Sequence, residues 1–326
     1  MTDFLASMPG AIIILVVGFV LLIKGADYFV DGASAVAAKL HVPALIIGMT
    51  IVAMGTSLPE TAVSVTASIN NANSLAISNA VGSNIFNLMV VLGVCACIAK
   101  IPVSDDTIKR DLPFSVVCAI VTLVMGAIGM KLGRLDGNIL LVMFALFLIV
   151  MVRSAKAAAA RGEQVEIEGL EDGQIKDMST LKCILCIILG GAAIALGGDW
   201  VVDGATTVAI KLGMSETLVG LTIVALGTSL PELVTSFAAA RKNEIDMAVG
   251  NVVGSNVFNL LMVVGIACTI SPIEFLTINI IDIIILVIFS IIAWLMCFKK
   301  KHIGRIDGVI MLVLYFAYIV YTIIRE

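Results

Sequence analysis

Thr50-Ile-Val-Ala-Met-Gly-Thr-Ser-Leu-Pro-Glu60 is a stretch of eleven residues that returns 172 positions later, with one change, as Thr222-Ile-Val-Ala-Leu-Gly-Thr-Ser-Leu-Pro-Glu232. Each copy lies in an apolar segment and carries one carboxylate, which is costly wherever a segment faces lipid. Two shorter phrases repeat at the same offset: Gly82-Ser-Asn-Ile-Phe-Asn87 matches Gly254-Ser-Asn-Val-Phe-Asn259, and Asp27-Tyr-Phe-Val-Asp-Gly-Ala33 matches Asp199-Trp-Val-Val-Asp-Gly-Ala205. The chain therefore consists of two copies of one unit, each of which contributes half of a polar site.

The composition is that of a membrane protein. Of the 326 residues, 60 % are hydrophobic and 13 % are charged, and the mean hydropathy is +1.12, which excludes an ordinary soluble protein. Several apolar runs reach the ~20 residues that a helix needs to cross ~30 Å of hydrocarbon. A β-barrel would show short segments of alternating hydrophobicity instead. We predict an all-α membrane protein.

Ten transmembrane helices are predicted, as two inverted five-helix repeats. They cover residues 11–38, 44–69, 75–99, 112–130, 136–152, 183–210, 216–240, 246–270, 278–297 and 306–324. Residues 1–152 form the first repeat, 153–182 a linker and 183–326 the second repeat. The first span is a structural helix rather than a removed leader, because its Asp27 and Asp31 recur in the second half. Because five is odd, the second repeat enters the membrane from the opposite side, an arrangement that in transporters places the substrate site between the halves.

Basic residues set the orientation of the chain. If the N-terminus is outside, the inner loops hold fifteen of them: Lys39, Lys100, Lys109, Arg110, Arg153, Lys156, Arg161, Lys176, Lys182, Arg241, Lys242, Lys299, Lys300, Lys301 and Arg305. Only four then fall outside: Lys131, Arg134, Lys211 and Arg325. We therefore expect a multi-pass protein of the cell (inner) membrane with both termini outside and the linker in the cytoplasm.

Two other features offer only weak signals for a metal or redox site. Cys183 and Cys186 form a C-x-x-C, but it opens a predicted membrane helix and has no second pair or histidine nearby, so a metal or redox role is not expected there. The acidic run at residues 163–172 lacks the ligand and glycine spacing of a calcium-binding EF-hand loop. We interpret it as part of a solvated linker, and we predict no cofactor.

Proline interrupts the helix in each copy of the long phrase. Pro59 has no N–H for the carbonyl of Gly55, and Pro231 has none for that of Gly227, so each helix should break and expose main-chain carbonyls there. Such carbonyls are tolerated at membrane depth only where they are buried in protein, face water or bind an ion. Two broken helices at matching positions point to the binding site of a transporter.

Helical spacing gathers oxygen atoms around these breaks. The set comprises Ala53, Thr56, Glu60, Ser83 and Asn87 with their counterparts Ala225, Thr228, Glu232, Ser255 and Asn259. Carboxylate, hydroxyl, carboxamide and carbonyl oxygens are the ligands that Ca²⁺ and Na⁺ prefer. Zinc, copper or iron would call for imidazole or thiolate, and the two histidines, His41 and His302, sit at loop positions. An anion would require Lys or Arg in the site, so the predicted substrate is a cation.

The two glutamates also suggest how transport is coupled. Two ionised carboxylates in a low dielectric are costly, so the site should take up protons whenever it holds no metal. One Ca²⁺ would neutralise both, and several Na⁺ ions or two protons could replace it. If the empty, charged site rarely crosses between its two orientations, exchange follows, and antiport is our hypothesis.

The other repeated polar residues allow more than one interpretation. Asp27, Asp31, Asp199 and Asp203 pair with Lys24 or the backbone, or else line an ion vestibule, and we favour the structural interpretation. The glycines of the Gly-Ser-Asn phrases either pack helices together or serve the site. For the asparagines that end these phrases, ligation or support of a ligand is favoured.

The duplicated Gly-Thr-Ser-Leu-Pro-Glu and Gly-Ser-Asn-x-x-Asn phrases resemble those of the calcium/cation antiporter superfamily, most closely its prokaryotic sodium/calcium exchanger branch. The resemblance covers essentially the whole chain and implies ten helices that exchange Na⁺ influx for Ca²⁺ efflux by alternating access. The calcium ligands that it implies are Glu60, Glu232, Thr56 and Thr228. The sodium ligands that it implies are Ala53, Ser57, Ser83, Ala225, Ser229 and Ser255, with Asn87 and Asn259 as polar groups between the sites. Asn259 stands where potassium-dependent relatives carry Asp, which argues against potassium co-transport.

The resemblance further implies that the first and sixth spans slide across the other helices to open the site to alternate sides. We interpret Gly25, Gly32, Gly197 and Gly204 as the close, mobile contacts of that movement.

A proton/calcium antiporter of the same superfamily is the nearest alternative. Such relatives tend to show G-N-x-x-E where this chain has its hydroxyl-rich phrase, and the extra hydroxyls suit Na⁺. A cation channel is a second alternative, which would show flux without a counter-ion. An intramembrane enzyme is not expected, because the sequence has no His-Glu-x-x-His, serine–histidine pair or paired catalytic aspartates. The expected partners are the lipid bilayer, Ca²⁺ and Na⁺, with no nucleic acid and no obligate protein partner.

Overall fold

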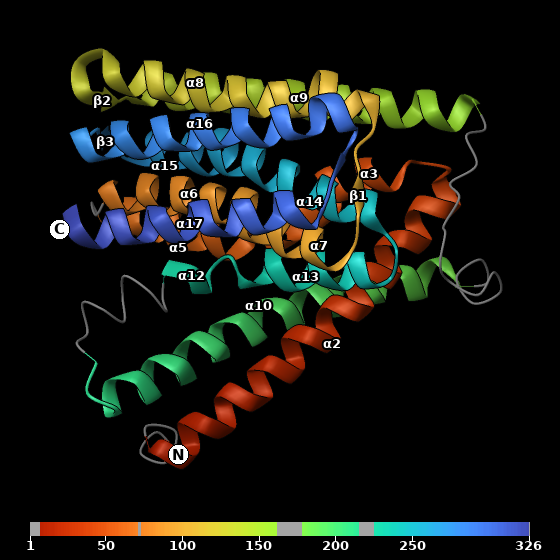
Figure 1. Ribbon diagram of the computed structural model, residues 1–326, viewed down its shortest axis with the longest axis horizontal. Helices are drawn as coiled ribbons and strands as arrows, with labels where there is room; N and C mark the ends of the chain where they lie inside the picture. The colour runs from red at the N-terminus through yellow and green to blue at the C-terminus, as the bar shows by residue number, and fades with distance from the viewer. Residues whose placement is uncertain (1–6, 71–72, 162–177, 215–224, 326) are drawn as a thin grey trace.

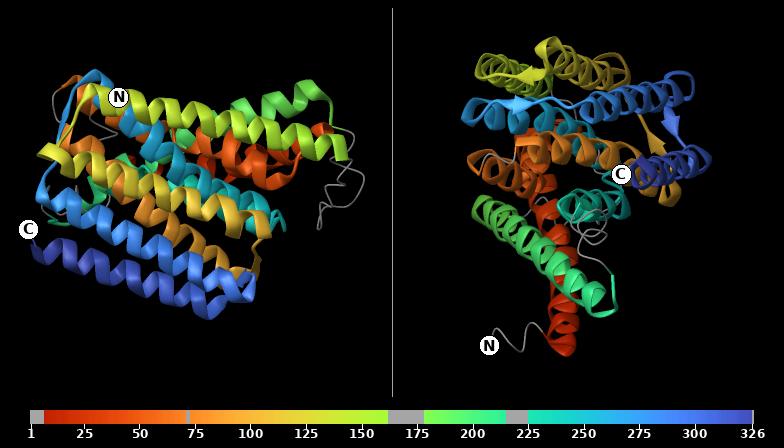
Figure 2. Two further views of the ribbon diagram at one scale, coloured as in Figure 1. Left: turned by 90° about the horizontal axis from the view of Figure 1, so that it is seen from above. Right: turned by 90° about the vertical axis from the view of Figure 1, so that its left-hand side faces the viewer.

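The structure is a bundle of long helices in stacked layers. The computed structural model describes residues 7–70, 73–161, 178–214 and 225–325. The helices α8 (Leu112–Ala127) and α9 (Arg134–Arg161) form one edge of the bundle, and α2 (Met8–Leu40) and α10 (Thr180–Lys211) form the opposite edge (Figures 1 and 2). The remaining helices lie between these edges.

The first half follows the predicted spans closely. Its inner elements are α3 (Ala44–Ile47), the π-helical η1 (Gly48–Val52), α4 (Ala53–Thr56), α5 (Leu58–Ile69), α6 (Asn73–Phe86), the π-helical η2 (Asn87–Val91) and α7 (Leu92–Ile98). The π-helical η3 (Thr107–Asp111) precedes α8, and the 3₁₀ turn η4 (Ile128–Met130) follows it. The predicted span 44–69 has the observed ends, with a bend of 48° inside it. The helix α9 continues nine residues past the predicted end at 152, because alanines, the strongest helix formers, follow there.

The second half repeats this order. Its elements after α10 are α12 (Ala225–Gly227), α13 (Leu230–Arg241), α14 (Ile245–Phe258), the π-helical η6 (Asn259–Val263), α15 (Val264–Ile270), α16 (Thr277–Lys300) and α17 (Arg305–Arg325). Residues 216–224 of the predicted seventh span lie outside the described residues. Among those that are described, eight helices could cross a membrane, or nine if α3–α4 and α5 count as one bent span. The predicted class, an all-α membrane protein, is confirmed.

Two short strand pairs, which were not predicted, tie the halves together at their loops. The strand β1 (Ile101–Pro102) pairs antiparallel with β4 (His302–Ile303), and β2 (Lys131–Leu132) pairs antiparallel with β3 (Ile273–Glu274). β1 precedes β3 by 172 positions and β2 precedes β4 by 171. The two pairs are therefore counterparts, and each one joins a loop of the first half to a loop of the second.

Glycine brings α2 and α10 into direct backbone contact. A Cβ on Gly25 would stand 2.9 Å from the main-chain oxygen of Gly190, and one on Gly197 would stand 2.6 Å from the main-chain nitrogen of Leu22. Gly32 and Gly204 contact the opposite helix of the same pair. The expected close contacts are therefore present, but they join the first and sixth spans to each other rather than to the remaining helices. Their part in movement stays a prediction.

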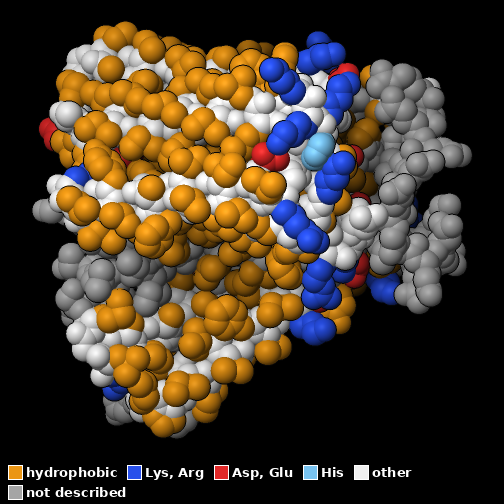
Figure 3. Space-filling view, in the orientation of Figure 1, with side chains coloured by type: hydrophobic (Ala, Val, Ile, Leu, Met, Phe, Trp, Pro, Cys, Tyr) orange, Lys and Arg blue, Asp and Glu red, His pale blue; other side chains and the backbone are white. Residues whose placement is uncertain are grey.

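Charged residues gather at one end of the bundle. In Figure 3, Lys and Arg side chains cluster beyond a wide apolar band, while the start of α2 and the end of α17 lie at the opposite end (Figure 1). At the basic end Lys301 forms an ion pair with Asp105 at 2.7 Å. Its ammonium hydrogen-bonds the carboxylate and thereby holds the pKa of Asp105 below the ordinary value.

Candidate ion-binding site

Both predicted helix breaks are present. The helix α4 ends at Thr56, Ser57 has φ −86° and ψ 11°, and α5 begins with Pro59 in its first turn. Ser229 has φ −95° and ψ 4° before α13, whose first turn holds Pro231. Proline is tolerated in a first turn because an N–H there has no partner within the helix. Each break therefore places a Thr-Ser pair directly before a helix whose first turn carries the glutamate.

Glu60 and Glu232 are each held by a serine of the other half. Ser57 Oγ donates to Oε1 of Glu232 at 2.9 Å, and Ser229 Oγ donates to Oε1 of Glu60 at 3.1 Å. Both glutamates are 0 % exposed, and Oε2 of each makes no hydrogen bond to any part of the chain that the structure describes. Because a buried ionised carboxylate is costly unless it is paired, these Oε2 atoms are candidate cation ligands.

Asparagine and serine side chains supply further unpaired oxygen atoms. Asn87 and Asn259 begin the π-helical η2 and η6, and such turns are frequent at functional sites. Both amide atoms of Asn87, Oδ1 of Asn259, and Oγ of Ser83 and Ser255 are buried without a hydrogen-bond partner among the described residues. Nδ2 of Asn259 donates to Oδ1 of Asn84 at 3.1 Å. Buried polar atoms without a partner are uncommon in folded proteins, and most of those here belong to the predicted set.

The other predicted ligands lie at the breaks themselves. Ala53 and Thr56 are fully buried, Thr228 lies in the turn between α12 and α13, and Ala225 begins α12. The main-chain oxygen of Ala53 accepts a hydrogen bond from the N–H of Ser57 at 3.1 Å. The missing N–H of Pro59 therefore leaves this hydrogen bond of Ala53 intact, because the carbonyl that loses its regular donor is that of Gly55.

Two asparagines that were not predicted as site residues also contact the breaks. Thr56 Oγ1 donates to Oδ1 of Asn251 at 3.1 Å, and Thr228 Oγ1 donates to Oδ1 of Asn79 at 3.4 Å. Asn79 and Asn251 are related by the same offset of 172 positions as the predicted ligands. That relation was visible in the sequence, although the spacing of these residues to the glutamates gave no reason to single them out.

The Gly-Ser-Asn phrases join α6 to α14. Asn84 Nδ2 donates to the main-chain oxygen of Asn256 at 3.0 Å, and Asn256 Nδ2 donates to that of Asn84 at 3.4 Å. A Cβ on Gly254 would stand 2.6 Å from the main-chain oxygen of Met49, whereas one on Gly82 would meet no atom of the described residues within 4 Å. The packing interpretation is therefore confirmed for Gly254. For Gly82 it stays a prediction, because Leu221, which stands 172 positions after Met49, lies outside the described residues.

Asp27 and Asp31 on α2 bind Lys242, the residue after α13. Lys242 Nζ donates to Oδ1 of Asp31 at 2.6 Å and to the main-chain oxygen of Asp27 at 2.7 Å, and it lies 3.9 Å from Oδ1 of Asp27. These two aspartates are structural ion-pair partners, as favoured from the sequence. Their partner is Lys242 rather than Lys24.

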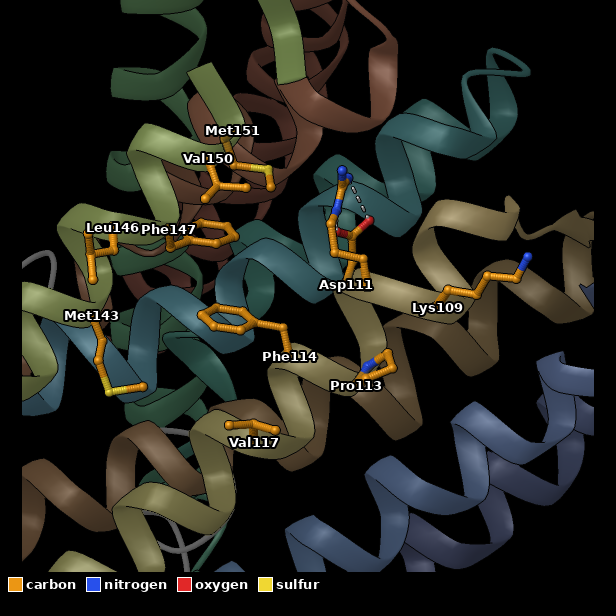
Figure 4. Close-up of a pocket in the computed structure, with 11 residues that line it drawn as sticks. Lys109, Asp111, Pro113, Phe114, Val117, Met143, Leu146, Phe147, Val150 and Met151 are labelled. Atoms are coloured by element: carbon orange, nitrogen blue, oxygen red, sulfur yellow. Dashed lines mark hydrogen bonds and ion pairs between the residues drawn. The ribbon is translucent and has the colours of Figure 1, made fainter. Parts of the chain in front are cut away.

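The cavity drawn in Figure 4 lies away from these residues, between α8 and α9. It has a volume of about 460 Å³ and a mainly apolar lining, with the Arg110–Asp111 ion pair at one end. Phe114 and Phe147 stack inside it with ring centroids 5.6 Å apart. None of its lining residues belongs to the predicted site.

Comparison with known proteins places the chain in a family. The model of the sodium/calcium exchanger protein family matches residues 10–153 and 182–324. Inner membrane protein YrbG of Escherichia coli (strain K12) is 37 % identical over 307 residues, which are 91 % of this chain and 92 % of that protein. Sodium/calcium exchanger MaX1 of Methanosarcina acetivorans is 31 % identical over 345 residues, with 94 % and 97 % covered.

A solved structure extends the likeness to the fold. The sodium-calcium exchanger NCX_Mj, soaked with Na⁺ and Sr²⁺, superposes with a TM-score of 0.83 at 32 % identity, over 96 % of this chain and 99 % of that one. The family matches span both halves of the sequence, and the structural match spans nearly all of it. The chain is a membrane protein that belongs to the sodium/calcium exchanger family, whose members are cation antiporters rather than enzymes.

Proposed function

We propose that this chain exchanges Na⁺ for Ca²⁺ across the cell membrane by alternating access. The observation that carries the proposal is the pair of fully buried carboxylates, Glu60 and Glu232. Each has one oxygen hydrogen-bonded to a serine of the other half and one oxygen without a partner among the described residues. A single Ca²⁺ between them neutralises both charges. Hard oxygen ligands of this kind suit Ca²⁺ and Na⁺.

The proposed architecture is ten spans in two inverted repeats of five, residues 1–152 and 183–326, joined by a cytoplasmic linker. The counterpart strand pairs and the matched helix breaks support the repeat. Both termini lie outside in this arrangement. The gathering of Lys and Arg at the end opposite the start of α2 supports the orientation, because cytoplasmic loops carry the excess of basic residues.

Each proposed ligand has a role in binding Ca²⁺ or Na⁺. The calcium ligands are Glu60 and Glu232 with the main-chain oxygens of Thr56 and Thr228. The sodium ligands are Ala53, Ser57, Ser83, Ala225, Ser229 and Ser255, and Asn87 and Asn259 lie between the sites. A serine hydroxyl donates one hydrogen and keeps two lone pairs, so Ser57 and Ser229 can hold a carboxylate and bind Na⁺ with the same oxygen. Because Na⁺ and Ca²⁺ share the glutamates, binding of one ion species weakens binding of the other.

Coupling to Na⁺ rather than to protons is tested by ⁴⁵Ca²⁺ uptake into proteoliposomes. Vesicles loaded with Na⁺ are compared with choline-loaded vesicles that carry an imposed pH gradient. We expect uptake only with internal Na⁺, because the serine hydroxyl next to each carboxylate adds an oxygen ligand of the kind that suits Na⁺. Uptake driven by the pH gradient alone would assign the same glutamates to a proton/calcium antiporter, and uptake that needs neither would indicate a channel.

The glutamates are tested by replacing each one with glutamine. Glu60→Gln or Glu232→Gln removes one of the two charges that bind Ca²⁺, so uptake should fall to the level of empty vesicles while the protein still inserts. Glu244→Gln is the matched control, because Glu244 is 5 % exposed but lies before α14, outside the proposed site. Near-normal uptake in either site variant would contradict the assignment.

A further inference from the structure

Asn251 connects the break of the first half to the glutamate of the second. Its Oδ1 accepts from Thr56 Oγ1 at 3.1 Å, while its Nδ2 lies 2.9 Å from Oγ of Ser236 and 3.4 Å from the main-chain oxygen of Glu232. Thr56 Oγ1 also lies 3.2 Å and 3.3 Å from the main-chain oxygens of Val52 and Ala53. The bond to Asn251 is the shortest of the three.

Asn79 makes the equivalent connection in the other direction, from the first half to the second. Its Oδ1 accepts from Thr228 Oγ1 at 3.4 Å, and its Nδ2 lies 3.1 Å from Oγ of Ser64 and 3.3 Å from the main-chain oxygen of Glu60. In each asparagine, Oδ1 therefore contacts the other half of the chain, and Nδ2 contacts the half to which the asparagine belongs. A carboxamide suits this position because it carries an acceptor and two donors on one rigid plane.

The asparagines complete a double link across each break. Thr56 and Ser57 are consecutive residues, and both are linked to Glu232. Ser57 donates directly to the carboxylate of Glu232, and Thr56 reaches the main-chain oxygen of Glu232 through Asn251. The chain at the break therefore has two anchors in the opposite half, one at Thr56 and one at Ser57. Thr56 is the last residue of α4, and the last carbonyls of a helix have no partner within that helix, so anchors of this kind determine where the carbonyl of Thr56 points.

We propose that Asn79 and Asn251 are positioning residues of the ion site: each one holds the threonine carbonyl of one half and the glutamate backbone of the other at the separation that Ca²⁺ requires. This inference rests on the proposed function of the site. The two asparagines do not contact the ion. They act through Thr56 and Glu232, and through Thr228 and Glu60.

The decisive variants are Asn251→Ala and Asn79→Ala, compared with Ser68→Ala. Ser68 is a buried serine of α5 that donates to the main-chain oxygen of Ser64 at 2.9 Å, so its variant removes a buried hydrogen bond near the site without cutting either link. Equilibrium ⁴⁵Ca²⁺ binding to purified protein and Na⁺-driven ⁴⁵Ca²⁺ uptake are both measured. The thermal unfolding midpoint in detergent is recorded for each variant, so that loss of fold is separated from loss of positioning.

Asn251→Ala should weaken Ca²⁺ binding and raise the KM for Ca²⁺ by about tenfold, the factor that corresponds to about 1.4 kcal/mol, with little change in maximal rate. Asn79→Ala should have a smaller effect, because its bond to Thr228 is longer and Asn79 is only half-buried, whereas Asn251 is 0 % exposed. Thr56→Val should match Asn251→Ala, and the double variant should be no worse than either alone, since both cut one link. Thr56→Ser keeps the hydroxyl that donates to Asn251, so its KM should rise less than that of Thr56→Val.

An Asn251→Ala variant whose KM and binding equal those of Ser68→Ala would overturn the inference. So would additive losses in the Thr56→Val, Asn251→Ala double variant, because independent effects would show that no shared link exists. Failure of the proposed function has a different signature: the wild-type protein itself would then show no Na⁺-dependent uptake, while its Ca²⁺ binding could still be compared among the variants.

Discussion

Replacing Lys242 with methionine should shift the equilibrium between the two conformations of the antiporter. In the described conformation Lys242, next to α13, holds α2 through Asp31 and Asp27. If α2 slides during transport, a displacement of one helical turn, about 5.4 Å, takes both aspartates out of reach of the ammonium. The ion pair therefore stabilises one conformation and not the other.

We expect the ion pair to contribute about 1–2 kcal/mol to that equilibrium. The side chains of Lys242, Asp27 and Asp31 are 17 %, 24 % and 30 % exposed, so the group lies between the fully exposed and the buried case. Exposed pairs contribute about 0.2–1 kcal/mol, and removing one partner of a buried pair costs about 3–5 kcal/mol. A change of about 1–2 kcal/mol alters a population ratio about 5- to 30-fold.

The assay is the apparent KM for Ca²⁺ at each face of oriented proteoliposomes. Apparent affinity at a face scales with the population that is open to that face, so the ratio of the outer KM to the inner KM follows the conformational equilibrium. Lys242 lies at the basic end, which is the inner end in our proposal. Its loss should favour opening there and raise the outer-to-inner KM ratio by about 5- to 30-fold.

Two matched variants sharpen this test. Lys242→Arg keeps the cation and should leave the ratio near that of the wild type.

The second variant is Asn70→Lys. Asn70 stands 172 positions before Lys242, and Asp199 and Asp203, the counterparts of the paired aspartates, form no ion pair within the described residues. Asn70→Lys would supply the cation at the other end and should also raise the ratio. An unchanged ratio in the methionine variant, in vesicles that exchange normally, would refute the reasoning.

Three further predictions concern stability. Gly197→Ala would set a Cβ against the backbone of α2 at 2.6 Å, so its thermal unfolding midpoint should fall below that of the wild type. Asp282→Asn weakens the bidentate pair with Arg325 and should lower the free energy of unfolding by roughly 2 kcal/mol, measured by denaturant titration in detergent micelles. Burial raises the pKa of Glu244 above its usual 4.5, so the folded state favours the protonated form and loses stability as the pH rises from that value through the raised pKa. Glu244→Gln should abolish this loss in melts recorded across that range, and an equal loss in the variant would exclude Glu244 as its cause.

The sequence predicted the spans and the helix breaks because both depend on local patterns. Apolar run length determines where a helix can cross lipid, and Pro59 and Pro231 interrupt their helices wherever the rest of the chain lies. The internal repeat then indicated that Glu60 and Glu232 belong to one site. Their serine contacts across the halves agree with that prediction.

Contacts between distant segments could not be predicted in the same way. Lys242 lies 211 residues from Asp31, and no local spacing distinguishes it from Lys24 as a partner. The π-helical start at Asn87 depends on packing rather than on any pattern of residue types. The asparagine links needed the positions of both halves, because each carboxamide bridges two segments that are remote in sequence.

The glycine contacts between α2 and α10 have a consequence for leakage. Because their backbones touch at several points along an antiparallel crossing, a shift of one helix carries the other with it. If these helices are the moving part, they move as one body. The openings of the site to the two sides of the membrane are then not independent of each other. A simultaneous opening, which would let Ca²⁺ run down its gradient without Na⁺, would require the pair to separate. The strict coupling of Ca²⁺ movement to Na⁺ movement would then depend on the backbone contacts at these glycines rather than on the groups that bind the ions.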